Sequence, residues 1–264
     1  MSQSEDFAAA FEAALTTKVL GHPVRHFPFS VTAESLALQW ARQEKVNEGA
    51  CVVVDREMAP RQRKGAPWTG FATDALSCSV VLRPGVPPEG EGLMWMLACL
   101  GGASGIENAT GIETQIKWPD DILAGGRKIG GVKVDALLGP GEIMIAVMTF
   151  RINLNVDEQA FPEALRDVAT SVLLETGKAM SREEALDGVL GGLEHWYGQD
   201  VPDLLEAYRS RCETVGRQVR ARLLPKGEVM GKVSAVSDFG TLLVDVGGRP
   251  TPVGIDQLRK LEYT

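Results

Sequence analysis

Apolar residues recur at helical spacing in several stretches of the chain. Phe7, Phe11 and Leu15 stand four residues apart, which predicts an amphipathic helix over 7–17. A second helix is predicted after Ser30, and further helices are predicted over 93–100, 162–175, 181–197 and 201–212. The helix at 93 is expected to end near the glycines at 101 and 102. Ser181 and Glu184 form the capping-box pattern that begins a helix.

Short apolar runs between turn residues predict strands. Before residue 214 they cover 50–54, 75–82, 115–118, 122–123, 128–136 and 143–150, and afterwards 219–223, 229–236, 241–246 and 252–255. Gly125-Gly126 supplies the positive φ angles of a tight hairpin. The pattern predicts an α+β protein with a sheet flanked by helices over 1–214 and a small β-barrel over 215–264.

Composition narrows the class of protein. The chain has 27 Lys and Arg against 35 Asp and Glu, a net charge of −8, and 44% apolar residues. This composition excludes a chain that is mainly disordered. No apolar run approaches the roughly 18 residues of a membrane span, and the first residues lack the basic and apolar regions of a secretory signal. The acidic balance disfavours a nucleic-acid-coating protein, so we expect no nucleic-acid or membrane partner.

Cysteine and histidine usage exclude further classes of site. The four cysteines are scattered and form no C-x-x-C pair, so we expect no zinc site and predict buried, reduced thiols in a cytoplasmic protein: Cys51, Cys78, Cys99 and Cys212. None of the three histidines has the context of a nucleophilic triad, and G-x-S-x-G is absent.

Three polar segments could carry chemistry. The basic loop at 61–65 could cradle an anion, although it could equally be a solvated surface loop. The segment 117–121 ends in two adjacent carboxylates that could bind Mg²⁺ or orient an amine, or could merely cap a turn. If a strand begins near Lys128, then Lys128, Gly130, Val132 and Val134 share one face, and Gly130 leaves room beside the lysine for a ligand.

The order of these motifs resembles the biotin protein ligase family over about residues 27–262. The motifs that carry the resemblance are the basic loop ending in Trp68, K-W-P-D-D at 117–121, G-R-K-I-G-G at 126–131 and R-I-N at 151–153. The resemblance implies a mixed-sheet catalytic domain of the class II synthetase type, followed by an SH3-like barrel. It also implies that ATP, with Mg²⁺, adenylates biotin, and that the acyl group then passes to a lysine of a carrier protein. Residues 1–26 are too few and too weakly basic for the DNA-binding domain of the repressor-type members.

The resemblance also assigns roles to single residues. It implies catalytic roles for Lys128, Asp121, Arg61 and Arg63. It implies that the following residues bind biotin or nucleotide: Thr32, Glu57, Gly65, Trp68, Lys117, Trp118, Arg127, Gly130, Gly131 and Asn153. It implies no protein-bound catalytic metal.

The sequence departs from the family pattern around the expected biotin ring. Val31 and Ala33 replace polar residues, Glu57 replaces a glutamine, and Arg151 replaces a glycine. Lys133 interrupts an apolar strand position, Asp120 replaces an asparagine, and the basic loop has lost two glycines and one arginine. Two lost hydrogen bonds at about 1.5 kcal/mol each predict biotin binding weaker by about two orders of magnitude.

Two hypotheses from different classes follow. The first is a ligase that adenylates biotin or a related small acid, such as lipoate or octanoate, and transfers it to a carrier lysine. The second is a binding protein that keeps the ligase fold without turnover. A lipoyl or octanoyl transferase is a weaker third, because the cysteine or glycine-rich motif that it needs is not found in context.

Overall fold

The computed structural model describes residues 3–43, 46–61, 63 and 68–264, which form two β-sheets and six α-helices. The helices are α1 Gln3–Ala14, α2 Ala33–Gln43, α3 Glu91–Thr110, α4 Val172–Thr176, α5 Arg182–Tyr197 and α6 Val201–Arg211. The strands of the first sheet are β1 Val24–Ser30, β2 Cys51–Glu57, β3 Ala75–Leu82, β4 Thr114–Lys117, β5 Asp121–Ala124, β6 Arg127–Leu138 and β7 Ile143–Asn153. Those of the second are β8 Gln218–Leu223, β9 Glu228–Val236, β10 Leu242–Val246, β11 Arg249–Val253 and β12 Leu258–Tyr263.

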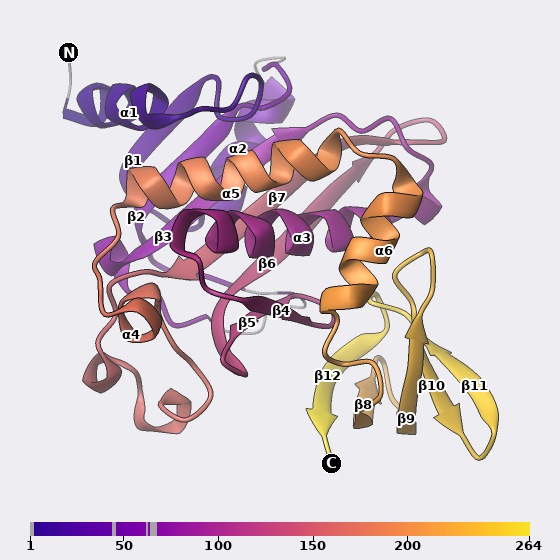
Figure 1. Ribbon diagram of the computed structural model, residues 1–264. Helices are drawn as coiled ribbons and strands as arrows, with labels where there is room; N and C mark the ends of the chain where they lie inside the picture. Colours follow the sequence, from indigo (N-terminus) through magenta and orange to yellow (C-terminus); the bar gives the residue numbers. More distant parts are fainter. Residues whose placement is uncertain (1–2, 44–45, 62, 64–67) are drawn as a thin grey trace.

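The first sheet is mixed. Its strand order is β1-β2-β3-β7-β6-β5-β4, in which β1 and β2 are parallel and every other pair is antiparallel. The second sheet is antiparallel in the order β11-β10-β9-β8-β12 and lies beside the end of α6 (Figure 1). This arrangement confirms the predicted α+β class with a mixed sheet and a small all-β tail. The division into domains at residue 214 stays a prediction.

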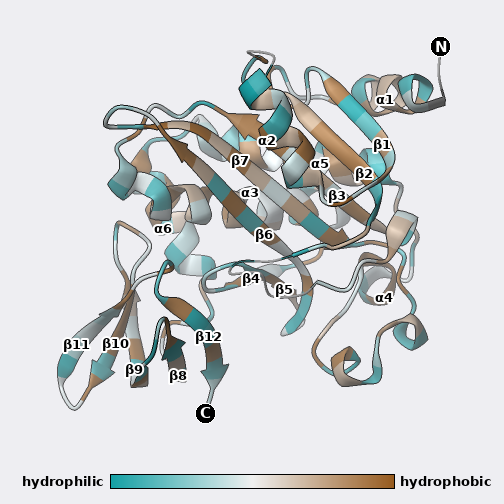
Figure 2. Ribbon diagram, turned by 180° about the vertical axis from the view of Figure 1, so that it is seen from behind, coloured by the Kyte–Doolittle hydropathy of each residue, from teal (hydrophilic) through white to brown (hydrophobic). Residues whose placement is uncertain are grey.

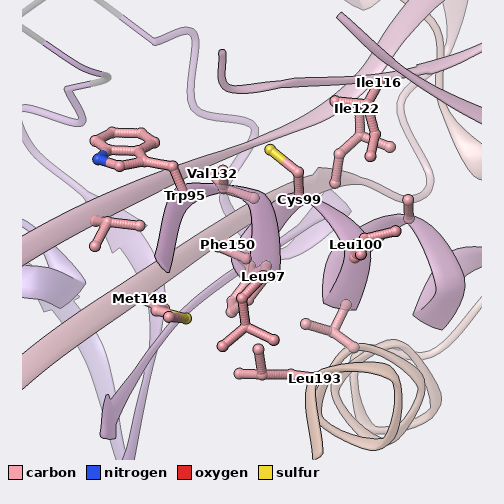
Figure 3. Close-up of a cluster of buried hydrophobic side chains, with 14 of the residues drawn as sticks. Trp95, Leu97, Cys99, Leu100, Ile116, Ile122, Val132, Met148, Phe150 and Leu193 are labelled. Atoms are coloured by element: carbon pink, nitrogen blue, oxygen red, sulfur yellow. The ribbon is translucent and has the colours of Figure 1, made fainter. Parts of the chain in front are cut away.

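Helices cover the two faces of the large sheet unequally. Helix α3 packs on one face and α5 packs on α3, enclosing the larger core, whose centre is shown in Figure 3 around Leu97, Phe150 and Leu193. Helix α2 covers the opposite face, where a smaller core surrounds Val52 and Val147 (Figure 2). Beyond α2, the same face of the sheet continues along β6 and β7. The side chains on this part of the face are polar.

Glycines let α3 run on where the sequence analysis predicted its end. The helix continues through 101 and 102 to Thr110. A side chain at 101 would enter α5, and one at 102 would meet Ile122 and Phe150 of the large sheet. A Cβ on Gly105 would lie 2.4 Å from the carbonyl oxygen of Gly188, and one on Gly101 would lie 2.8 Å from Cα of Leu193. The glycines therefore serve close helix packing, which outweighs their low helix propensity.

We expect Gly105→Ala to lower the free energy of unfolding by about 2–3 kcal/mol, because the backbone of α5 cannot yield to the added methyl group. Gly191 on α5 is the matched control, since nothing lies within 4 Å of an added Cβ. Gly191→Ala should stabilise the protein by about 0.5–1 kcal/mol. Urea unfolding of both variants measures the difference, and equal effects would contradict the packing argument.

The structure confirms some of the other predicted elements and contradicts others. The capping box of α5 is present, and Gly125 and Gly126 adopt φ angles of 55° and 78° in the β5–β6 hairpin. The single helix predicted over 162–175 is wrong, because the chain forms a 3₁₀ turn at Glu163–Leu165 and only then the short α4. Strands β1 and β12 were not predicted, and the fourth strand of the tail, predicted at 252–255, is β11 at Arg249–Val253. All four cysteines are buried free thiols, as predicted.

Candidate active site

Lys128 lies where β5, β6 and the end of the basic loop meet. Its ammonium group is paired with the carboxylate of Asp121 and lies 4.9 Å from the centre of the Trp68 ring. About one fifth of each side chain of the ion pair is exposed, so the pair is partly dehydrated yet open to a ligand. The ammonium group is therefore accessible to a carboxylate or a phosphate.

A β-bulge decides which way Lys128 points. Asp121 pairs with Gly131, and Leu123 pairs with Lys128, with a shift of register between the two pairs. Because residues directly opposite on antiparallel strands share a face, Lys128 shares its face with Asp121 and Gly131. The predicted shared face of Lys128, Gly130, Val132 and Val134 is therefore wrong.

Gly130 does not provide ligand space. A Cβ there would lie 2.5 Å from Cδ1 of Ile152 and 2.8 Å from the carbonyl oxygen of Arg151, so this glycine permits close packing against β7. The predicted room beside Lys128 at Gly130 is therefore wrong, and Gly131 is the glycine on the lysine's face.

Arg63 and Asp120 form a second charged pair beside the first. Nε of Arg63 lies 3.9 Å from Oδ2 of Asp120, and its Nη1 donates to the carbonyl oxygens of Ile255 and Leu258 in the second sheet. Burial lowers the pKa of Arg63 despite the neighbouring carboxylates. Arg63 thus contacts the C-terminal part of the chain through these two carbonyl groups.

Burial and the charge of Asp121 raise the pKa of Asp120 to about 6, although Lys128 and Arg63 oppose the shift. A carboxyl whose pKa is higher in the folded than in the unfolded protein contributes most stability below pH 4. That contribution is lost as the pH rises through 6. Asp120→Asn should therefore gain stability relative to the wild type between pH 4.5 and 7, by on the order of 2–3 kcal/mol. Thermal unfolding of both proteins across this pH range tests the prediction. Parallel pH profiles of stability for the two proteins would contradict it.

Four of the predicted binding residues make structural contacts. The Lys117 ammonium lies 4.6 Å from the centre of the Tyr263 ring, and buried Trp118 donates from Nε1 to the Gly240 carbonyl at 2.8 Å. Arg127 pairs with Glu175 at 2.8 Å, and Asn153 donates to the Thr170 carbonyl at 2.9 Å. The buried Oδ1 of Asn153 has no hydrogen-bond partner among the residues that the structure describes.

The remaining predicted residues lie around the start of α2 and the basic loop. Thr32 Oγ1 accepts from the Ser35 amide at 3.2 Å, and Glu57 accepts from the Ala33 amide at 2.8 Å. Arg61 is exposed, and its carbonyl accepts from Arg151. Gly65 lies outside the described residues.

The sequence analysis missed a buried ionic network centred on Arg151 of β7. Its guanidinium donates from Nε to Glu57 at 2.6 Å and from Nη2 to Glu34 at 2.7 Å and to Glu57 at 2.8 Å. Nη1 donates to the Arg61 carbonyl at 3.0 Å. Burial acts to lower the pKa of Arg151, but the hydrogen bonds and charges of the two carboxylates raise it. We call Arg151, Glu34 and Glu57 the Arg151 fork.

The fork was detectable in part from sequence. Arg151 and Glu57 were recognised there as departures from a family pattern, but nothing in the sequence showed that they touch. Glu34 carried no signal, because a glutamate in the first turn of a helix is ordinary.

A large hollow lies away from these groups. It is about 1130 Å³ in volume and lies between α3, α4 and α5, and its lining includes none of the predicted site residues. Among residues 3–43, 46–61, 63 and 68–264, no helix is long and apolar enough to cross a membrane. Within the same residues no cluster of three or more His, Cys, Asp or Glu could hold a metal ion.

Comparison with known proteins identifies the family. Residues 29–153 match the family model described as the biotin/lipoate A/B protein ligase family. The bifunctional ligase/repressor BirA of Bacillus subtilis is 30% identical over 236 residues, which cover 88% of this chain and 72% of that protein. The chain belongs to the biotin protein ligase family. The biotin–[acetyl-CoA-carboxylase] ligase of Mycobacterium tuberculosis is also 30% identical, over 78% of this chain and 77% of the relative.

Solved structures of the family share the fold. The biotin protein ligase of Aquifex aeolicus in complex with biotin and ATP is 22% identical, with a TM-score of 0.71 over 91% of this chain and 99% of that one. A biotin protein ligase-like protein of unknown function from Silicibacter is 14% identical, with a TM-score of 0.69 over 91% and 96% of the two chains. The two sheets of this biotin protein ligase family member are therefore those of the family.

Proposed function

We propose that the chain is an ATP-dependent ligase that activates a small carboxylic acid, biotin or a relative, as its acyl-adenylate. It would then transfer the acyl group to a lysine of a carrier protein. The observation that supports this proposal is the position of the Lys128 ammonium group. Asp121 and Trp68 hold it at a partly exposed position of the sheet. Membership of the family supports the reaction type.

The chemistry needs a cation where two anions meet. A carboxylate oxygen of the acid attacks the α-phosphorus of ATP, the bond between that phosphorus and the β-phosphate oxygen breaks, and pyrophosphate leaves. Lys128 lowers the repulsion between carboxylate and phosphate and stabilises the charge that develops on the phosphate oxygens. Asp121 holds the ammonium in place, which fixes its direction before the substrates bind.

The second step uses no nucleophile of the enzyme. The carrier's lysine amine attacks the acyl carbon, the bond to AMP breaks, and the amine loses a proton. Because adenylate is a good leaving group, the scarcity of nucleophilic constellations in the sequence is no obstacle. We assign this reaction to the cytoplasm, which suits a chain with four free buried thiols.

The residues that the structure describes do not form a dedicated Mg²⁺ site. One oxygen of Asp121 is engaged by Lys128, and Asp120 faces Arg63 and is buried, so the two adjacent carboxylates do not present a joint set of oxygen ligands. We derive no step through Mg²⁺. The roles of Lys128, Asp121, Arg61 and Arg63, and the boundary between domains at residue 214, are part of this proposal.

The test is pyrophosphate release from ATP with a panel of acids that includes biotin, lipoate, octanoate and shorter chains. Release that depends on one acid supports the ligase. ATP binding without release in the presence of any acid, measured alongside by calorimetry, would instead indicate a binding protein on the ligase fold.

A further inference from the structure

The Arg151 fork is a complete ionic unit. The side chains of Arg151, Glu34 and Glu57 are 4%, 7% and 4% exposed, so all three charges are almost fully withdrawn from water. Lys133 extends the unit, with Nζ 3.4 Å from Glu34 and 2.6 Å from Asp135. A buried charge is tolerated only where it is paired, and here each one is paired.

Several residues that differ from the family pattern lie together in and around the fork. Arg151, Glu57 and Lys133 each put a charge where the family carries a neutral residue, and the structure brings the three into one network through Glu34. A site that has merely decayed would leave such charges unpaired or exposed. Instead, the guanidinium of Arg151 is paired with both carboxylates at 2.6–2.8 Å, so the substituted residues fit one another.

The fork lies on the same face of the sheet as the catalytic lysine. Arg151 pairs with Gly131 on one side of β6, and Asp121, which holds Lys128, pairs with Gly131 on the other. Two strand spacings therefore separate the backbones of Asp121 and Arg151, about 10 Å. Gly131 is itself buried and presents no side chain between them, so the fork is the next side-chain group across β6 from the Lys128–Asp121 pair.

The fork has little bonding capacity left for a ligand. Nε, Nη1 and Nη2 of Arg151 all donate within the protein, and both oxygens of Glu57 and of Glu34 accept. A ureido ring, with one carbonyl and two N–H groups, would need free partners in this space. A short aliphatic acid needs none.

We propose that the Arg151 fork is the specificity determinant of the acid site, and that it closes the site to biotin and admits a short carboxylic acid that ends before the fork. This inference rests on the proposed function for the reaction but makes a separate statement about the substrate. The fork also fixes the backbone at Arg61, because Arg151 donates to the carbonyl oxygen of that residue.

The experiment compares three combinations of substitutions with the wild type. Arg151→Ala with Glu34→Gln and Glu57→Gln removes the charges together and opens the space. Arg151→Met with the same two changes removes the charges but keeps the space filled. Arg222→Ala with Glu228→Gln and Glu262→Gln makes the same types of change on the outer sheet, where these side chains are 30–50% exposed.

Two readouts are needed, biotin affinity by titration calorimetry and ATP–pyrophosphate exchange with butyrate, hexanoate, octanoate and biotin. In the wild type we expect exchange with a short acid at least tenfold more efficient than with biotin. In the Ala combination we expect biotin affinity to rise at least tenfold. The Met combination and the outer-sheet control should bind biotin as the wild type does.

The outcomes separate the two proposals. Tight biotin binding by the wild type, or a folded Ala combination with unchanged biotin affinity, overturns the fork as a specificity determinant while leaving the ligase intact. Absence of exchange with every acid overturns the proposed function, and the calorimetric comparison still decides the role of the fork. If the Ala combination does not fold, the wild-type affinity and acid preference decide it.

Discussion

Replacing Lys128 with alanine is expected to slow formation of the acyl-adenylate by about 100- to 1,000-fold, the usual cost of losing one preorganised charge at a reacting phosphate. The ammonium is the only group of the Lys128–Asp121 pair that can attract both anions. Without the ammonium, the carboxylate of Asp121 repels both anions, so the loss of rate should be at the upper end of that range. ATP–pyrophosphate exchange at saturating acid measures the effect.

Lys117 is the matched control for this variant. It is the other lysine of the same motif region, but its ammonium packs on the Tyr263 ring toward the C-terminal sheet. Lys117→Ala should reduce exchange less than tenfold. Equal losses in the two variants would mean that Lys117 also reaches the substrates, and no loss in Lys128→Ala would remove the basis of the proposed site.

The second large effect concerns stability. Arg151→Met alone should lower the free energy of unfolding by about 3–5 kcal/mol at pH 7, because it leaves the carboxylates of Glu34 and Glu57 buried without a counter-charge. Adding Glu34→Gln and Glu57→Gln should recover most of that loss, since replacing a whole buried ionic unit by neutral groups is often close to neutral. Urea unfolding of the single and combined variants measures the coupling free energy between Arg151 and the two glutamates directly.

The control for Arg151 lies on the outer sheet. Arg222 pairs with Glu262 at 3.2 Å, but its side chain is half exposed. Arg222→Met should therefore cost less than about 1 kcal/mol, as exposed ion pairs usually do. A small effect at Arg151 as well, or no recovery in the combined variant, would show that the fork is not one energetic unit.

The local sequence was sufficient for elements whose signals are local. Ser181 and Glu184 predicted the start of α5, and Gly125-Gly126 predicted the hairpin, because a capping box and a positive-φ turn depend on residues a few positions apart. The strand at Ala75–Leu82 was equally plain from its apolar run. The family motif also singled out Lys128 and Asp121 from separate strands, and the structure brings them into contact.

Tertiary structure decided the rest. The path of α3 through its glycines depends on the backbone of α5, some 90 residues further along the chain. The face that Lys128 occupies depends on one bulged residue, because a shift of one position in a strand reverses every side chain. The Arg151 fork joins charges from α2, β2 and β7, and each of them alone is only an unfavourable buried charge. The sequence therefore determined most of the elements, the family and the candidate cation. Only the fold showed which charges meet, because pairing energy depends on distance in space and not on position in the chain.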